Sequence, residues 1–224
     1  MNLVKQFSTI LRDAADPIWT KILKHPFLQE MRAGTLPLDK FQYYLMQDYY
    51  YLLAFVRCLG LAVAKDLERI REFSLALHNS ITIEVDKLES LGHTLGLTTE
   101  MLRMVNPAPT NLAYTRHLFF IAYTGTTGEL MAGLLPCIWT YQEIGETLGE
   151  SEVVRQHTIY SKWCDTYIAP EYRQLVSWYK QIVDHHAENA GKQVHDAMRR
   201  HFVLSSRYEY LFWDMAYNKE QWLI

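Results

Sequence analysis

Hydrophobic positions recur at intervals of three and four along most of the chain, which is the pattern of amphipathic helices. Alternation of apolar and polar positions, which would predict strands, never lasts more than a few residues. Short stretches rich in glycine, proline or threonine separate the periodic segments. We therefore predict helices over about residues 3–24, a short one after His25–Pro26, 37–64, 67–95, a short one through Val105, 112–123, 127–148, 151–168, 171–190 and 192–217.

The clearest loop is the segment NPAPTN, Asn106–Asn111, because two prolines within a few residues stop a helix. Gly96 is placed to end one helix, and Thr98 or Thr99 is placed to cap the next. The chain contains no linker, low-complexity tract or internal repeat. The sequence predicts one all-α domain over residues 1–224.

Three predicted helices each carry a single carboxylate within an otherwise apolar face. These carboxylates are Asp48, Glu84 and Glu209. An isolated buried carboxylate is expensive, so each must be paired, hydrogen-bonded, protonated or open to a polar cavity. The three faces read Phe41, Tyr44, Asp48, Tyr51, Leu52, Phe55; Leu77, Ile81, Glu84, Leu88, Leu91; and Phe202, Ser206, Glu209, Phe212, Trp213, Ala216.

These carboxylates allow two interpretations. In the first, each accepts hydrogen bonds from tyrosine or arginine and only fixes the register of its helix. In the second, they are acid/base groups, because desolvation raises a carboxyl pKa towards neutrality. Three such residues in one chain, each with apolar or aromatic neighbours, favour the second interpretation for the set.

The stretch LLPCIWTYQEIG, Leu134–Gly145, places a proline directly before a cysteine inside a predicted helix. A proline there removes a backbone donor and kinks the helix, which can turn the next side chain into a cavity. Cys137 is that side chain, and Tyr141 lies one turn along on the same face. From spacing alone, Cys137 is either a small buried hydrophobe or a reactive thiol.

Composition and charge narrow the function classes. Of 224 residues, 49% are hydrophobic, which suffices for a full core. The net charge of −3 and the absence of a basic block argue against nucleic acid as a partner. The first thirty residues lack a signal-peptide pattern, and no apolar run reaches the length of a membrane span. Three widely spaced cysteines indicate free thiols, so we expect a soluble cytoplasmic protein.

Two metal-based alternatives have weak local support. No glutamate is followed three residues later by histidine, the spacing typical of helical di-iron proteins. The reversed spacing occurs at His185 and Glu188, in a polar helix end. His25 is placed near the amino end as a haem ligand would be, but it directly precedes Pro26 and is typical of a helix start. We expect no metal site.

Four segments carry a resemblance to a known family. LLPCIWTYQEIG resembles the catalytic-cysteine helix of the TenA family, also called thiaminase II or aminopyrimidine aminohydrolase. HPFLQEMRAGTLPLDKFQYYLMQDYYYL (His25–Leu52), YSKWCDTYIAPEY (Tyr160–Tyr172) and FVLSSRYEYLFWDMAY (Phe202–Tyr217) resemble its other signatures, in order. The likeness spans nearly the whole chain and identifies it as a cysteine-containing member of that family.

The resemblance implies a role for each matching residue. Cys137 falls at the position of the nucleophile, Glu209 at that of the partner acid, and Asp48 at that of the carboxylate that binds the pyrimidine amino edge. Glu84 matches no assigned position, so a structural role is expected for it. Aromatic positions around the ring and the thiol fall at Tyr51, Tyr114, Tyr141, Tyr167 and Phe212.

The resemblance also implies the fold and the activity. The fold would be a haem-oxygenase-like helical bundle, assembled as a homotetramer. The enzyme would hydrolyse 4-amino-5-aminomethyl-2-methylpyrimidine to the hydroxymethyl pyrimidine and ammonia, and thiamin more slowly, for thiamin salvage and without a cofactor. Two other functions stay open at this point: a metal- or cofactor-dependent oxidase of the same fold, and a regulatory protein without enzymatic activity.

Overall fold

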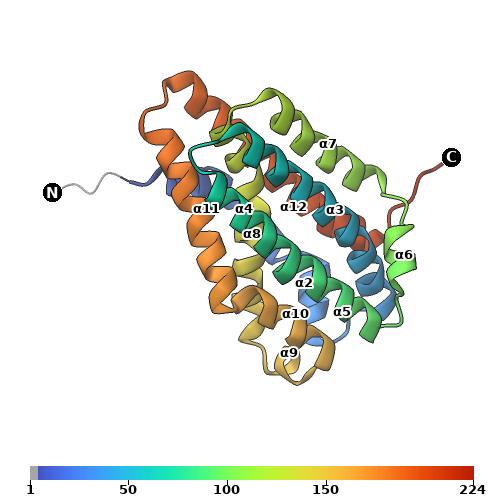
Figure 1. The fold of residues 1–224 in the computed structure, drawn as a ribbon. Coiled ribbons are helices and arrows are strands. Elements are labelled where there is room, and N and C mark those ends of the chain that lie inside the picture. Colours follow the sequence, from blue (N-terminus) through green and yellow to red (C-terminus); the bar gives the residue numbers. More distant parts are fainter. Residues whose placement is uncertain (1–4) are drawn as a thin grey trace.

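The computed structural model describes residues 5–224, and within that range every regular element is a helix (Figure 1). The elements are α1 (Phe7–Leu23), α2 (Pro26–Ala33), α3 (Leu38–Lys65), α4 (Ile70–Asn79), the π-helical segment η1 (Ser80–Val85), α5 (Asp86–Thr94), α6 (Thr99–Arg103), α7 (Pro109–Thr124), α8 (Thr127–Gly149), α9 (Glu152–Gln156), α10 (Thr158–Ile168), α11 (Pro170–Glu188) and α12 (Lys192–Asn218).

Helix α8 is the most deeply buried element of the bundle. It packs on α10, α11 and α12, and every residue from Leu130 to Ile138 is buried. A helix that is apolar all round needs such an environment, because it has no face to present to water. The core position of α8 therefore encloses Pro136 and Cys137, and α8 continues as a helix through the proline.

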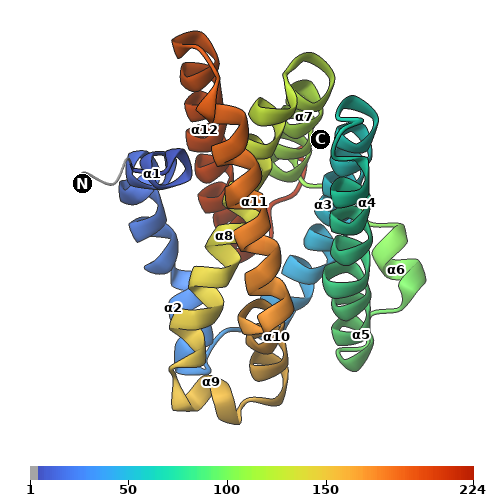
Figure 2. The same cartoon turned by 60° about the vertical axis from the view of Figure 1, so that its left-hand side comes forward.

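Helix α3 forms a second wall of the core. It packs on α7 and α12, and on its other side it contacts the rod made by α4, η1 and α5. Figure 2 shows α4 and α5 following one another along one edge of the bundle, with α11 and α12 further across. The core thus lies between three sets of helices: α3 with its rod, α8 with α10 and α11, and α12.

Most predicted helices are confirmed, with differences at their ends. The first predicted helix includes residues 3 and 4, which lie outside the described residues; α1 begins at Phe7. Thr98 caps α6 as predicted, since its side chain accepts a hydrogen bond from Met101 N at 3.1 Å. The predicted loop of residues 106–111 is too long, because Pro109 stands at the first turn of α7, where proline is tolerated.

Two predicted helices are interrupted. The segment predicted as 151–168 is α9 and α10, separated at His157, which has extended backbone and whose ring accepts a hydrogen bond from Tyr160 N at 3.4 Å. The segment predicted as 67–95 contains the π-helical turn η1, which changes the helical register. The expected face is therefore wrong at Ile81, which is 39% exposed, whereas Ser80 is buried in its place.

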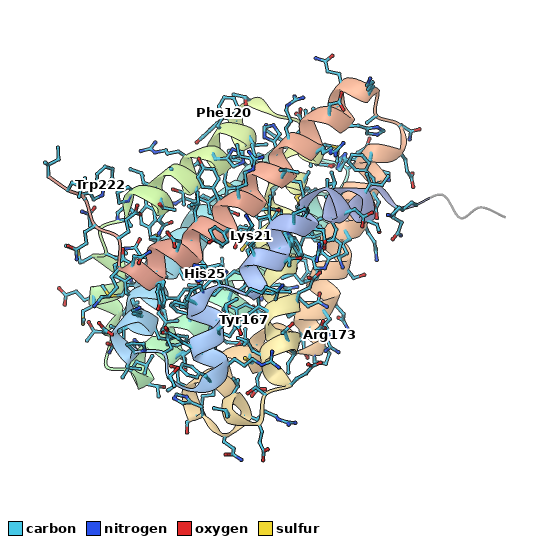
Figure 3. All side chains as sticks on the ribbon, turned by 180° about the vertical axis from the view of Figure 1, so that it is seen from behind. Lys21, His25, Phe120, Tyr167, Arg173 and Trp222 are labelled. Atoms are coloured by element: carbon cyan, nitrogen blue, oxygen red, sulfur yellow. The ribbon has the colours of Figure 1, made fainter. Side chains whose placement is uncertain are left out.

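The segment after α12 has no regular structure but is held to the bundle. The Trp222 indole donates a hydrogen bond to the Pro107 carbonyl at 2.9 Å, and the Glu220 carboxylate accepts one from Thr110 N at 2.9 Å. Figure 3 shows Trp222 and Phe120 at the outside of the molecule, whereas His25 lies where α1 meets α2. None of the helices of residues 5–224 has the length and apolarity needed to cross a membrane.

Gly145 lets α8 approach α10 closely, and we predict that Gly145→Ala destabilises the protein. A Cβ atom there would lie 2.9 Å from the Cβ of Tyr167, an atom that cannot move without its backbone. The clash outweighs the gain in helix propensity, so we expect a loss of about 1–3 kcal/mol in the free energy of unfolding.

Gly60→Ala in α3 is the matched control, because nothing lies within 4 Å of the added Cβ. We expect this variant to gain about 0.5–1 kcal/mol from helix propensity alone. Chemical unfolding of both variants measures the difference. Equal stability of the two variants would contradict the close approach of α8 and α10 at Gly145.

Candidate active site

Asp48 lies in α3, on a face buried against the centre of the bundle. Its Oδ2 accepts a hydrogen bond from the Tyr44 hydroxyl at 3.0 Å, and that hydroxyl accepts one from the Trp163 indole at 3.2 Å. Burial raises the pKa of Asp48 to about 7, although the hydrogen bond from Tyr44 lowers it in part. A carboxyl group in this state can exchange a proton near neutral pH.

Glu209 lies in α12 and faces the same interior. The Tyr114 hydroxyl of α7 donates a hydrogen bond to Glu209 Oε1 at 2.5 Å. Burial raises the pKa of Glu209 to about 8, the hydrogen bond from Tyr114 opposes that rise, and the charge of Asp48 adds to it. The raised pKa favours the protonated form of Glu209 at neutral pH, and a carboxyl group in this form can give its proton to a bound base.

Cys137 is buried in α8 among these carboxyl groups. Burial raises its pKa well above the ordinary value, and the charges of Glu209, Glu84 and Asp48 raise it further. Tyr51 acts in the opposite direction and favours the thiolate. These effects favour the thiol form of Cys137, and a positive charge beside the sulfur would favour the thiolate.

Two clusters of aromatic rings belong to the helices that carry these polar side chains. In one cluster the Tyr51 ring lies 4.9 Å from that of Tyr114 and 5.6 Å from that of Phe212, measured between centroids. In the other cluster the centroids of Tyr141 and Tyr167 are 5.0 Å apart. The structure thus brings all eight residues singled out in the sequence into one region, and their roles stay predictions.

Several buried polar atoms in this region have no hydrogen-bond partner within residues 5–224. Atoms of this kind are rare in folded proteins and indicate a place where water or a ligand binds. Those that come from the helices around Cys137 are Tyr51 Oη, Ser80 Oγ, Glu84 Oε1, Tyr179 Oη and Trp213 Nε1.

A pocket of about 280 Å³ lies beside this region. It lies between α3, α5 and α10, and Glu84, Trp163 and Tyr167 are among the residues that line it. Tyr167 is labelled in Figure 3 and belongs to α10. Glu84 and Tyr167 are themselves buried, whereas Lys87 and Thr94 of the same pocket are exposed, so the pocket extends from the surface to two buried side chains of this region.

Sequence reasoning missed the residues that hold the predicted ones in place. In the sequence, Tyr44 is only one position of an apolar face and Trp163 only one position of a family motif, yet the hydrogen bonds from Trp163 to Tyr44 and from Tyr44 to Asp48 together orient the Asp48 carboxyl. Ser80 and Tyr179 give no signal in the sequence, because Ser80 is a small polar residue and Tyr179 is one of fifteen tyrosines.

Among residues 5–224, no three His, Cys, Asp or Glu side chains are arranged to hold a metal ion.

The sequence of this chain matches the TENA/THI-4/PQQC family over residues 12–219. The fold and the site described above are those of a helical-bundle protein with a buried thiol and buried carboxyl groups. The chain belongs to the TENA/THI-4/PQQC family, which confirms the family resemblance found in its motifs.

Two relatives are similar over almost their full length. The aminopyrimidine aminohydrolase of Bacillus subtilis is 38% identical over 97% of this chain and 92% of its own. The aminopyrimidine aminohydrolase of Halalkalibacterium halodurans is 35% identical over 96% of this chain and 97% of its own. These similarities place the chain among enzymes, in the hydrolase class.

Solved structures confirm the predicted fold class. The TenA homologue from P. horikoshii superposes with a TM-score of 0.87, at 33% identity over 96% of this chain and 99% of its own. The haem oxygenase of Leptospira interrogans superposes with a TM-score of 0.69 at 11% identity, over 93% of this chain and 98% of its own, which shows a shared fold alone. The chain is a haem-oxygenase-like helical bundle.

Proposed function

We propose that this chain is an aminopyrimidine aminohydrolase that converts 4-amino-5-aminomethyl-2-methylpyrimidine and water into the hydroxymethyl pyrimidine and ammonia. The observation that carries the proposal is the grouping of Cys137 with Asp48 and Glu209 inside an aromatic shell. Similarity to relatives named aminopyrimidine aminohydrolase supports it, and it also supports a role in thiamin salvage.

Binding uses the aromatic shell and Asp48. The pyrimidine ring lies between the rings of Tyr51 and Phe212 on one side and those of Tyr141 and Tyr167 on the other, where stacking favours a flat ligand. Asp48 accepts hydrogen bonds from the ring's own amino group. Because Tyr44 fixes the Asp48 carboxyl, that contact sets the orientation of the ring.

Attack on the ring uses Cys137 and Glu209 together. Glu209 protonates a ring nitrogen, and the positive charge that results lowers the pKa of the neighbouring thiol. The thiol proton passes to the Glu209 carboxylate while sulfur bonds to the ring carbon next to the one that bears the aminomethyl group. The net step adds S–H across the ring and leaves Glu209 as it was.

Loss of the amine follows from the adduct. The lone pair of the ring amino group, held by Asp48, moves into the ring and expels the substituent of the exocyclic methylene carbon. Water adds to that carbon, and reversal of the sulfur addition releases the product and restores Cys137. Thiamin carries a thiazolium group at the same carbon and is cleaved by the same sequence, more slowly.

The assay that tests this proposal compares the two substrates on purified protein. Chromatography of the products is expected to show the hydroxymethyl pyrimidine from both, with a higher kcat/KM for the aminomethyl pyrimidine than for thiamin. A protein that co-purifies with iron and acts on neither compound would instead support an oxidase. A protein that binds DNA or another protein, and is unaffected by loss of Cys137, would support a regulator.

We also propose, from the family resemblance, that the chain acts in the cytoplasm as a homotetramer. Sedimentation of the purified protein measures the assembly directly. A stable monomer with full hydrolase activity would show that neither the fold nor the site needs the tetramer.

A further inference from the structure

Glu84 is a third buried carboxyl group that the steps above do not use. It is 4% exposed and lies in the π-helical turn η1, between α4 and α5. Its Oε1 has no hydrogen-bond partner within the described residues. Single π-helical turns inside α-helices are frequent at functional sites, and this one turns Glu84 towards the core.

Two further buried polar side chains, Ser80 and Tyr179, belong to the surroundings of Glu84. Ser80 Oγ and Tyr179 Oη are also buried and make no hydrogen bond of ordinary geometry within residues 5–224, although Ser80 is near enough to Glu84 and Tyr179 to lower the pKa of each. Burial and the charge of Asp48 raise the pKa of Glu84 to about 8, while Ser80 lowers it in part. This raised pKa favours the protonated form of Glu84 at neutral pH.

Glu84 and the carboxyl groups and thiol of the candidate site influence one another's pKa values. Asp48 raises the pKa of both Glu84 and Glu209, whereas neither glutamate acts on the other. Glu84 also acts on Cys137, more strongly than Asp48 does. Glu84 and Glu209 come from separate elements, η1 and α12, and each of these elements packs on α3.

The reacting groups of the pyrimidine follow one another around the ring. Around the pyrimidine, the nitrogen protonated by Glu209 comes first, then the carbon attacked by Cys137, then the carbon bearing the aminomethyl group, then the carbon whose amino group Asp48 binds. The aminomethyl group therefore projects between Cys137 and Asp48, away from Glu209. Glu84 lines the pocket together with Tyr167, one of the residues proposed to flank the ring.

We propose that Glu84 is the acid that protonates the departing amine. The proposal rests on the proposed function. In the steps of that function the exocyclic nitrogen is the one reacting group without a protein partner, and Glu84 is here assigned to it. Ser80 and Tyr179 complete a small polar site that accommodates the amine before the step and ammonia after it. Glu84 also lines the pocket to the surface, which gives ammonia an exit and water an entry.

The step balances as follows. The Glu84 carboxyl proton moves to the amine nitrogen as the bond between nitrogen and the methylene carbon breaks, and the electron pair of that bond leaves with ammonia. The lone pair of the ring amino group forms the new bond into the ring. Water then bonds to the methylene carbon through its oxygen and gives one proton to the Glu84 carboxylate, which restores the acid.

Glu84→Gln tests the proposal when its effects on kcat are compared for two substrates with different leaving groups. Ammonia needs a proton to leave, whereas the thiazolium of thiamin leaves as a neutral thiazole without one. We expect kcat for the aminomethyl pyrimidine to fall about 100-fold, the scale of general acid catalysis, and kcat for thiamin to fall less than about threefold. Asp86→Asn, an exposed acid two residues along, is the matched control and is expected to leave both rates unchanged.

Each other outcome has a distinct meaning. Equal losses on both substrates would assign Glu84 a structural role and overturn the proposal, and so would unchanged rates on both. Loss on thiamin alone would place Glu84 at a different step and overturn it as well. If the wild-type protein acts on neither compound, the proposed function fails, and this proposal fails with it. Glu209→Gln is the positive control: it is expected to lower kcat on both substrates, which shows that the assay detects a general defect.

Discussion

Cys137→Ser is expected to lower kcat for the aminomethyl pyrimidine by about 1,000-fold or more. Serine keeps the size of the side chain but has a far less acidic hydroxyl group. In a site where carboxyl groups already raise the pKa of the thiol, an alkoxide is still harder to form. The adduct on which expulsion of the amine depends would not accumulate at a useful rate.

The measurement is formation of the hydroxymethyl pyrimidine by each purified variant. Cys58→Ala is the matched control, because Cys58 is buried in α3 as deeply as Cys137 is in α8, yet it is not among the groups that act on Cys137. We expect this control to keep kcat within about twofold while losing stability from the small cavity. Full activity of Cys137→Ser would show that carboxyl groups alone perform the reaction.

Glu209→Gln is expected to lower kcat by about 100- to 1,000-fold on both substrates, because glutamine cannot protonate the ring nitrogen. The same variant is expected to be more stable than the wild type at pH 8. The folded wild type holds a proton on Glu209 up to a pKa of about 8, whereas the unfolded chain releases it near the ordinary glutamate pKa of 4.5. The wild type therefore loses stability as pH rises between these values, and glutamine does not.

Both readouts come from one set of samples: kcat at neutral pH and urea unfolding from pH 5 to pH 8. Glutamine still accepts the hydrogen bond from Tyr114, so the geometry around it is kept. Lower activity together with higher stability at pH 8 is what a functional buried acid produces. A variant that loses stability at every pH would show that Glu209 holds the fold together instead.

The helical bundle could be predicted because local periodicity is strong in this chain. In α12 the residues from Phe202 to Ala216 that share one face in the sequence also share it in the structure. The differences arise where local rules depend on tertiary contacts. The π-helical turn at Ser80–Val85 changes the register without any proline or glycine to mark it. The end of α9 depends on His157, a residue that rarely caps a helix.

The candidate site was predictable in its main residues and not in its connections. A carboxylate within an apolar helix face is visible in sequence, so Asp48 and Glu209 could be singled out. The hydrogen bond that Tyr114 donates to Glu209 joins residues 95 positions apart. The one that Trp163 donates to Tyr44 joins residues 119 positions apart. No local pattern gives such pairs, because they exist only once the helices have packed.

The measurement that tests the account most directly is the release of ammonia from 4-amino-5-aminomethyl-2-methylpyrimidine by the purified wild-type protein, with the pyrimidine product quantified in the same samples. The account predicts saturable release, with one molecule of hydroxymethyl pyrimidine formed for each molecule of ammonia. Absence of release from this compound, together with absence of cleavage of thiamin, would contradict the account.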